Sequence, residues 1–532
     1  MKTIQTILIA AALLTQSIYL LQAQSTEGTK FWLTFGQNGS NPNNIPDLQI
    51  RIAAKDHSAI GRIHFTNLGT YKDFDIQARQ TYTYPLSSTE ATSVYNTTMG
   101  IFNKSICITS SDPVSVYAMN QHPATADATN ILPVTVLGTE YYQISYSCIS
   151  DRYGVVATED NTDIFHNNFH IGTLNAGEVY YRISTTGDMT GTFISSSKPI
   201  AFFSLSRGFG INPLSALDHG MQQLAPINTW GKEFFVPVSH IIKDHVRIVA
   251  SQNGTNISQS GGTIHPVSGG QTSLTNLQAG QFVELAVPLS SNGCHIVANH
   301  PVGVCTYLWG GNNYGDAAIC WLPPKEQSVK SALIAPFIPN PPTNITAHYA
   351  TVFTPTATRD NTKVSIGGGA PTGLTGGVWI ANTASGMSFY KMPLTNSIEA
   401  YYLTNPAGLL VLCYGVGNSE SYYYPAGFAM RDLDAAFYAN DIHFQDLKDN
   451  SFCEGLVEFR TEIEGLHPTA SDSIMWYIND VFVTSQATWN KTFENGTYEI
   501  KLVVRYENNT YATLTGTLKI QALWIKIRNV RY

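Results

Sequence analysis

Three acidic residues occupy matching places in similar stretches of the chain. Asp127 begins DATNILPV, Asp218 begins DHGMQQLAP and Asp316 begins DAAICWLPP. If these stretches surround a common axis, the three carboxyl groups meet, and grouped carboxyls can bind a ligand or share acid and base roles in glycoside hydrolysis. Alternatively, each aspartate hydrogen-bonds the backbone of its own turn. The three residues are therefore candidate binding residues, and the sequence singles out no catalytic pair among them.

Two further clusters resemble metal sites by spacing alone. His166 and His170 (HNNFH) would share a face only on a helix, whereas the flanking pattern indicates a strand and a turn. The acidic run at 160–163 resembles a calcium loop but lacks the glycine and the distal glutamate of an EF-hand. The corresponding stretches at 253–256 and 360–363 do not keep both of its acids. We therefore predict a structural turn here and no metal ligands.

Motifs of nucleophilic or cofactor chemistry are missing from the sequence. There is no GxSxG nucleophile elbow and no HExxH helix, and the glycines at 208–210 and 367–369 precede no predicted helix that could hold a phosphate. We expect no catalytic residues, no cofactor and no enzymatic activity. A carbohydrate-active hydrolase remains the alternative, because its two acids need only meet in space.

The cysteines allow one disulfide hypothesis. The chain has seven cysteines, and Cys294 and Cys305 stand symmetrically about Asn299-His300. If these two residues form a tight hairpin turn, the cysteines face each other across two antiparallel strands and can form a disulfide. The equally simple interpretation is two small buried residues.

The elements that would position these residues come from an internal repeat. A short apolar strand, a polar turn with proline and a second apolar strand recur around Pro113, Pro199, Pro301 and Pro406. The copies lie roughly 100 residues apart, and such a period indicates repeated structural units. Asn-Gly, Asp-Asn and Ala-Gly steps between alternating apolar runs are typical of hairpins. We expect the proline phrase itself to be a hairpin.

These patterns predict an all-β fold of three to four tandem β-sandwich-like repeats of about 100 residues, or alternatively a propeller-like ring. The expected organisation is a repeat region at 24–440 that follows a leader at 1–23. Its units are expected at about 28–137, 138–230, 231–335 and 336–440.

A different module follows the repeats. Charged residues become denser after Asp441, and the proline phrase stops. Residues 441–521 resemble an immunoglobulin-like or PKD-like β-sandwich, with Trp476 in the core, a turn at Asn479-Asp480 and the strand GTYEIKLVVRY from Gly496. A short tail at 522–532 completes the chain.

Composition indicates an exported protein. Residues 1–23 have the charged start, apolar run and small-residue end of a signal peptide, which predicts cleavage near Ala23 and a secreted or outer-surface location. No later segment is long and apolar enough to span a membrane as a helix. Charged residues make up only 13 %, and the net charge of −8 without a basic stripe argues against nucleic acid as a partner.

Several stretches together carry a family resemblance. GTKFWLTF at Gly28, DLQIRIAAKD at Asp47, ICITSSDPVSVYAMN at Ile106 and DATNILPVTVLGTEYY at Asp127 resemble the N-terminal domain of IgGFc-binding proteins. The resemblance is strongest over 28–330 and extends to about 435. The domain is widespread in surface proteins of Bacteroidota. The leader and the PKD-like module also resemble those of exported Bacteroidota proteins. The resemblance implies binding of a protein, although fold similarity does not transfer antibody Fc as the ligand.

We therefore expect a secreted or cell-surface adhesion protein that recognises host or neighbouring-cell glycoproteins. The partner is expected to be a protein, a glycoprotein or a glycan, and the sequence indicates no oligomeric state. Trp309 and the tyrosines at 422–424 are candidate contact residues, because aromatic side chains give large, rigid contact area; core packing is their alternative role. A third hypothesis is a structural subunit of an extracellular assembly that uses exposed strand edges.

Overall fold

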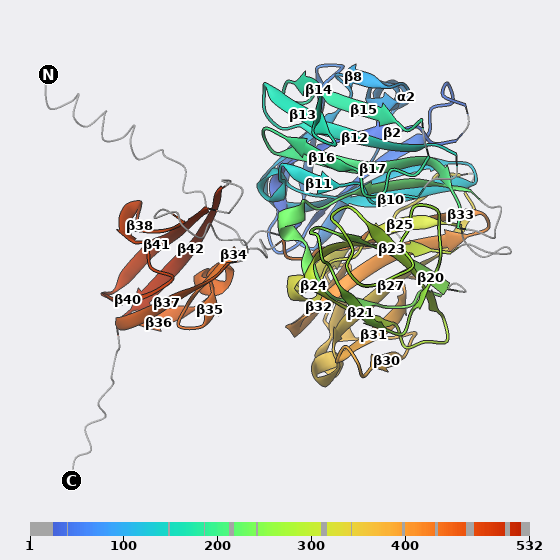
Figure 1. Ribbon diagram of the computed structural model, residues 1–532. Coiled ribbons are helices and arrows are strands. Elements are labelled where there is room, and N and C mark those ends of the chain that lie inside the picture. Colours follow the sequence, from blue (N-terminus) through green and yellow to red (C-terminus); the bar gives the residue numbers. More distant parts are fainter. Residues whose placement is uncertain are drawn as a thin grey trace, which may run out of the picture. The chain divides into compact units, whose positions relative to one another are not determined.

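The computed structural model describes residues 25–522 apart from 40, 147–148, 186, 212–216, 241–242, 310–315, 342, 396–398, 431–434, 464–472 and 506–510. These residues are mostly β, about 60 % strand and 6 % helix, in several antiparallel sheets. The chain divides into a large unit, Gln24–Leu433, which we call the repeat unit, and a C-terminal unit from Asp434 onward (Figure 1). The expected leader at 1–23 and residues 523–532 of the expected tail lie outside the described residues. Within the described ranges, no helix has the length and apolar character to cross a membrane.

The first repeat is organised around one long strand, β9 (Ile106–His122), in a sheet of order β5-β4-β9-β3-β6 to which β1 and β10 also pair. A short helix, α2, begins after Ser87, whose side chain and that of Glu90 form a reciprocal capping box. The other elements are β1 (Gly28–Leu33), β2 (Phe35–Gly36), β3 (Asp47–Ala54), β4 (Ala59–Phe65), β5 (Thr70–Ile76), β6 (Gln80–Pro85), α2 (Ser88–Val94), β7 (Tyr95–Asn96), β8 (Gly100–Phe102), β10 (Thr125–Ile131) and η1 (Val134–Val136).

The second repeat has two separate sheets, of order β11-β16-β13-β14 and β18-β17-β12-β15-β8. The last strand of the second sheet, β8, comes from the first repeat, so neighbouring repeats share a sheet. The elements are β11 (Glu140–Tyr142), β12 (Asp151–Ala157), β13 (Thr162–His166), β14 (Phe169–Leu174), β15 (Val179–Ile183), β16 (Phe193–Ser196), β17 (Ile200–Phe209), β18 (Asp218–Gln223) and η2 (Ile227–Thr229).

The third and fourth repeats return to the plan of the first, each around one long strand. The third contains β19 (Gly231–Val236), β20 (Lys243–Ala250), β21 (Ile257–Ser260), β22 (Thr263–Ile264), β23 (Phe282–Pro288), β24 (Cys294–Leu308), β25 (Ala318–Trp321) and η3 (Lys325–Gln327). The fourth contains β26 (Val329–Ile334), β27 (Ile345–Pro355), η4 (Thr356–Asn361), β28 (Lys363–Ile366), β29 (Thr372–Gly373), β30 (Trp379–Asn382), β31 (Met387–Pro393), β32 (Tyr401–Gly417) and β33 (Glu420–Pro425).

The proline phrase is a bent strand and not the expected hairpin. Residues 106–110 of β9 pair with β1 and β4, whereas residues 115–122 pair with β3 and β10. β24 and β32 change partners in the same way on either side of Pro301 and Pro406, and in the second repeat Pro199 separates β16 from β17. Proline has no N–H to donate, so it is tolerated where the chain leaves one ladder and enters the next.

This geometry overturns the disulfide hypothesis. Cys294 and Cys305 lie on the single strand β24, where Cys294 pairs with Val236 and Cys305 pairs with Trp321. Eleven residues of strand, at about 3.3 Å each, separate them far beyond the roughly 7 Å Cα–Cα limit of a disulfide. Both are buried free thiols. The alternative, two small buried residues, is confirmed.

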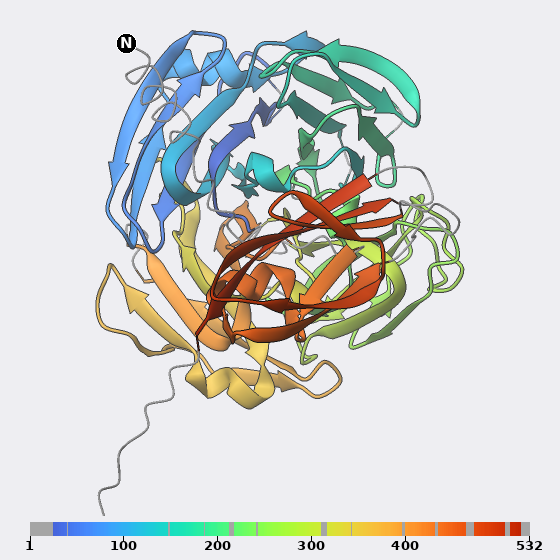
Figure 2. The same cartoon turned by 90° about the vertical axis from the view of Figure 1, so that its left-hand side faces the viewer.

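The four repeats surround a common axis. The innermost strand of each repeat contacts its neighbours in the cyclic order β10, β18, β25, β33, and β33 returns to β10. Figure 2 shows the repeats, from blue through green and yellow to orange, arranged in turn around a centre. The two ends of the unit meet where the Thr26 N–H donates to the Phe428 carbonyl at 3.1 Å, and Ser25 bridges Ala429.

The C-terminal unit contains two sheets, β35-β34-β37-β40 and β36-β42-β41-β38-β39. Trp476 is fully buried between them, and its Nε1 donates to the Gln486 carbonyl at 2.9 Å. The predicted turn at Asn479-Asp480 is confirmed, since both residues have positive φ between β38 and β39. The elements are β34 (Ala435–Ala439), β35 (Ile442–His443), η5 (Phe444–Asp449), β36 (Ser451–Cys453), β37 (Gly455–Ile463), β38 (Ile474–Ile478), β39 (Val481–Thr484), β40 (Thr488–Phe493), β41 (Gly496–Arg505) and β42 (Tyr511–Gln521).

Candidate binding site

The three repeated aspartates lie together at the axis of the repeat unit. Asp127 is on β10, Asp218 begins β18 and Asp316 stands just before β25, and their exposed fractions are 0 %, 0 % and 2 %. Each also accepts a hydrogen bond from the N–H of the next residue, at 2.8 Å in every case. The sequence offered two alternatives, that the three aspartates meet or that each one hydrogen-bonds its own backbone. In the structure they do both.

Asp127 joins all four repeats. Its Oδ1 accepts from the N–H groups of Ala128 and Tyr423, at 2.8 and 3.1 Å, and its Oδ2 accepts from those of Met221 and Ile319, at 3.1 and 3.2 Å. The donors lie on β10, β33, β18 and β25. Burial raises the pKa of the Asp127 carboxyl well above its usual range, while these four donors act in the opposite direction. Since a carboxylate has about four acceptor positions, Asp127 has none left for a substrate.

Asp218 and Asp316 form a second, closely coupled pair. Asp218 accepts from the N–H groups of Ala126 at 2.5 Å and Ser421 at 3.0 Å, and the Asp316 N–H donates to Ser421 Oγ at 2.8 Å. Burial, and then the charge of Asp316, raises the pKa of Asp218 well above its usual range. Burial raises the pKa of Asp316 to about 6. The Asp218 carboxyl is thus held by β10 and β33, whereas Asp316 is held to β33 through its backbone N–H.

The fourth repeat supplies an acid that sequence reasoning missed. Glu420 is fully buried at the start of β33, and it accepts from Gln121 Nε2 at 3.0 Å and from the Asn344 N–H at 2.7 Å. Its place at the start of an inner strand, like that of Asp218, was the available signal. The divergent stretch ESYYYP concealed that correspondence.

The residues of the histidine and calcium-like motifs have hydrogen-bond partners within the protein. His166 and His170 flank the β13–β14 turn, and they have separate partners: His166 Nδ1 lies 3.1 Å from the Tyr153 hydroxyl, and His170 Nε2 lies 3.2 Å from Asp163 Oδ1. The Ala176 N–H donates to Asp160 Oδ1 at 2.9 Å.

The third repeat builds the same turn as Asp160 without an acid. There the Ala279 N–H donates to Asn253 Oδ1, also at 2.9 Å. An amide oxygen thus replaces the carboxylate oxygen at the same distance, so an uncharged acceptor is enough to form this turn.

The proposed aromatic contact residues belong to the core. The tyrosines at 422–424 have exposed fractions of 0–1 %, and the Trp309 side chain is 9 % exposed, with Nε1 donating to the Ile211 carbonyl at 3.2 Å. Residues on β33 alternate between two faces that are both covered, because this strand lies at the axis. These side chains offer no surface to a partner.

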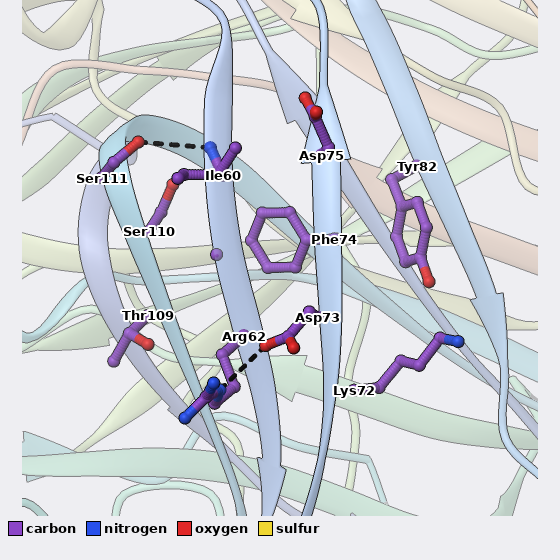
Figure 3. A pocket seen from close by; sticks show the side chains of 11 residues that line it. Ile60, Arg62, Lys72, Asp73, Phe74, Asp75, Tyr82, Thr109, Ser110 and Ser111 are labelled. Atoms are coloured by element: carbon purple, nitrogen blue, oxygen red, sulfur yellow. Dashed lines mark hydrogen bonds and ion pairs between the residues drawn. The ribbon is translucent and has the colours of Figure 1, made fainter.

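An exposed groove of about 820 Å³ lies instead on the first repeat, over β4, β5, β6 and the bend of β9 (Figure 3). Phe74 crosses β4 at Gly61, where a Cβ atom would come within 2.2 Å of the phenyl ring, so the glycine makes room for the groove floor. Ile60 and Tyr71 are 61 % and 56 % exposed beside it.

The groove carries a charged rim that the sequence reasoning also missed. Arg62 Nε donates to Asp73 Oδ1 at 2.9 Å, and the Arg62 guanidinium lies 3.7 Å from the centroid of the Tyr71 ring. The Lys72 and Asp75 side chains also line the groove (Figure 3). The alternation Asp73-Phe74-Asp75 on β5 was the signal in the sequence, but a half-exposed sheet face gives the same pattern wherever it lies.

Comparison with known proteins decides the family. The sequence profile described as IgGFc binding protein matches residues 127–415, which begin at Asp127 and run to β32. The chain belongs to the IgGFc binding protein family. The match covers more than half of the chain and includes the acids at the axis of the second and third repeats.

One curated member of the IgGFc binding protein family is the human IgGFc-binding protein, which is 29 % identical over 234 residues. That alignment covers 40 % of this chain and only 4 % of the human protein. Among solved structures, the Ca²⁺-stabilised ice-binding adhesin of an Antarctic bacterium aligns over 94 % of this chain and 100 % of its own, with 10 % identity and a TM-score of 0.12. Escherichia coli α2-macroglobulin aligns over 95 % of this chain and 48 % of its own, with 8 % identity and a TM-score of 0.15. Both TM-scores are far below those of proteins that share a fold.

Proposed function

We propose that this protein is a secreted or cell-surface binding protein that recognises a protein or glycoprotein ligand without catalysis. Membership of the IgGFc binding protein family supports a protein ligand. Asp127 and Asp218 support a non-catalytic role, because backbone N–H groups of the inner strands occupy their carboxyl oxygens. We interpret the repeats as a propeller-like ring of sandwich-like units and the C-terminal unit as an immunoglobulin-like module.

The exposed groove on the first repeat is the observation that carries this proposal. Tyr71 offers a large exposed ring, and Arg62 stacks on it while it is held by Asp73. Tyrosine and arginine dominate the binding energy of many protein interfaces, since both offer broad contact area with limited loss of conformational freedom. The stacking reduces the freedom that Arg62 would otherwise lose on binding.

The test is an array of glycans, host glycoproteins and purified antibody Fc, probed with residues 24–532. Saturable binding of at least one protein or glycoprotein is expected. In Tyr71→Ala and Arg62→Ala the affinity should fall at least tenfold, because such anchors contribute at least about 1.4 kcal/mol each. Phe169→Ala is the matched control: Phe169 is 76 % exposed on the β13–β14 hairpin, far along the chain from the groove, and its removal should leave the affinity unchanged.

Two results would overturn the proposal. One is the absence of saturable binding to every protein and glycoprotein on the array. The other is turnover of a polysaccharide that is lost in Asp316→Asn, which would favour the hydrolase. Concentration-dependent filaments of the same preparation would favour the structural subunit.

A further inference from the structure

A buried histidine of the third repeat has one ring nitrogen without a partner. His245 on β20 is 1 % exposed, and its Nδ1 lies 2.8 Å from Glu284 Oε1 on the neighbouring strand β23. The Nε2 atom has no hydrogen-bond partner among the described residues. Buried ring nitrogens are nearly always paired in folded proteins, so this atom calls for an explanation.

The surrounding contacts fix which nitrogen carries the proton. Glu284 is fully buried, and its Oε2 accepts from Arg247 Nε at 2.9 Å, so the carboxylate is held in the ionised form. Since a carboxylate only accepts, His245 Nδ1 is the donor, and Nε2 is the ring nitrogen left to bind a ligand.

A second imidazole lies beside the first. The His245 and His265 ring centroids are 4.7 Å apart with an interplanar angle of 86°, and ligand atoms of His245, His265 and Glu284 lie within 4.8 Å of one another. His265 follows β22 and is held by its N–H, which donates to the Glu284 carbonyl at 2.8 Å. Its side chain is partly exposed and makes no hydrogen bond within the described ranges, which leaves a path from solvent.

The electrostatics of this cluster permit a cation. Arg247 contacts both Glu284 Oε2 and Asp188 Oδ2, the latter at 2.6 Å, so two carboxylates face a single guanidinium in this cluster. A metal ion binds imidazole through a ring nitrogen that carries no proton.

We propose that His245 Nε2 and His265 bind one divalent transition-metal ion, with Glu284 as the carboxylate that orients His245. Imidazole nitrogens suit Zn²⁺, Ni²⁺ and Cu²⁺, and a ligating histidine usually donates its other N–H to a carboxylate or a carbonyl. Water completes the coordination on the exposed side of His265. The ion fixes the His265 segment to the sheet that carries His245.

Zn²⁺ alone is the probe. Tag-free residues 24–532, first dialysed against a chelator, are titrated with Zn²⁺ by calorimetry, and Co²⁺ provides an absorption spectrum that reports its ligands. One equivalent is expected to bind at this site. His265→Gln should weaken that binding at least tenfold and abolish the rise in Tm that Zn²⁺ causes. Glu284→Gln should weaken it about 10–100-fold, as loss of an orienting partner does.

The matched control is His170→Gln, which removes an exposed histidine that also lies beside an acid, Asp163, on another repeat. Its Zn²⁺ affinity and Tm shift should equal those of the wild type. The proposal is overturned if the wild type shows no stoichiometric Zn²⁺ binding. It is equally overturned if His265→Gln, with an unchanged circular dichroism spectrum and unfolding transition, binds Zn²⁺ as tightly as the wild type.

Discussion

A carboxylate surrounded by N–H donors contributes to stability through geometry, because each of its lone pairs satisfies a buried backbone group. Asp127 is such a residue, with four donors from four strands. An unsatisfied buried donor costs about 1–3 kcal/mol, so the cost of losing an acceptor can be estimated.

Asp127→Asn is expected to lower the free energy of unfolding of the repeat unit by about 2–5 kcal/mol. The amide keeps the shape of the side chain, but its NH₂ group faces two backbone N–H groups that had donated hydrogen bonds to a carboxylate oxygen. Urea denaturation followed by tryptophan fluorescence measures the change. Asp75→Asn, at an exposed site on β5, is the control and should stay within about 0.5 kcal/mol of the wild type. Equal stability of both variants would show that the four contacts contribute little.

Asp316 predicts a pH dependence of opposite sign to that of a salt-bridged acid. Its folded-state pKa of about 6 lies above the unfolded value, so the folded state binds the proton more tightly. Its contribution is fully present below the unfolded pKa and is lost as the pH rises through about 6. The stability of the wild type relative to Asp316→Asn should therefore increase by about 1 kcal/mol from pH 8 to pH 5. Urea midpoints of both proteins at the two pH values measure this difference, and a change of the opposite sign would contradict the assignment.

At the scale of elements, the bend in the long strand determines which side chains can pack against it. In β24 the chain changes from one set of partner strands to another at Pro301, and Gly303 lies two residues further along. A Cβ atom at Gly303 would lie 2.5 Å from the ring of Trp230, a fully buried side chain that begins the third repeat. Close contact between the bend and this indole is possible only because residue 303 has no side chain.

Gly303→Ala is therefore expected to destabilise the repeat unit by about 1–3 kcal/mol, the usual cost of overpacking a core. Thermal unfolding followed by circular dichroism measures it. Gly373→Ala is the matched control, since Gly373 is also in a strand, β29, and a Cβ atom there meets nothing within 4 Å. A similar loss in both variants would show that the contact with Trp230 is not its cause.

The thiols provide a second test of the bent strand. Because Cys294 and Cys305 are free and buried, a reducing agent should leave the Tm unchanged. Alkylation after unfolding without reductant, followed by mass spectrometry of the peptides, should label both residues. A peptide pair that is linked through these cysteines would show that the strand folds back as a hairpin.

The repeated order of strands and many turns could be predicted from sequence, whereas the bend could not. Hairpin residues such as Asn479 and Asn167 reveal themselves because their positive φ restricts residue type. A polar stretch with proline between two apolar runs is compatible with a hairpin and with a strand that changes sheets. Which of the two forms depends on the partners of each half, such as β4 and β3 for β9, and these come from distant sequence.

At the scale of the molecule, the first and fourth repeats contact each other both at the axis of the repeat unit and at its two chain ends. Contacts from the fourth repeat reach Asp127 and Asp218 through Tyr423 and Ser421, and the Phe428 carbonyl meets Thr26. The candidate acids could be named from sequence because they recur. That they lie close together could not, because it depends on how the four repeats are arranged around the axis. The exposed groove and the His245–His265 pair depend on which sheet faces are covered by neighbouring strands. A local sequence pattern does not show this.

Removal of the fourth repeat should therefore unfold the rest of the ring. A chain of residues 24–328 loses the Tyr423 and Ser421 donors and exposes the edges of β10 and β25, so we expect aggregation or no cooperative transition. A chain of residues 24–433 keeps every repeat and should unfold within a few degrees of the full chain. Size-exclusion chromatography and thermal melts separate the two outcomes. A monomeric, cooperative 24–328 chain would show that the repeats are independent.

The position of Asp127 also bears on how such a chain can arise by duplication. Asp218 and Asp316 precede the prolines that cap η2 and η3 by eight residues, whereas Asp127 precedes the proline that caps η1 by six. A single carboxylate accepts from all four inner strands, and only one side chain can occupy that point. Four identical copies would direct four like charges to one place, so duplicated repeats had to diverge at the centre before the ring could close. We therefore expect the sequences of the four repeats to differ most at the inner strands, where their arrangement about the axis is most nearly symmetric.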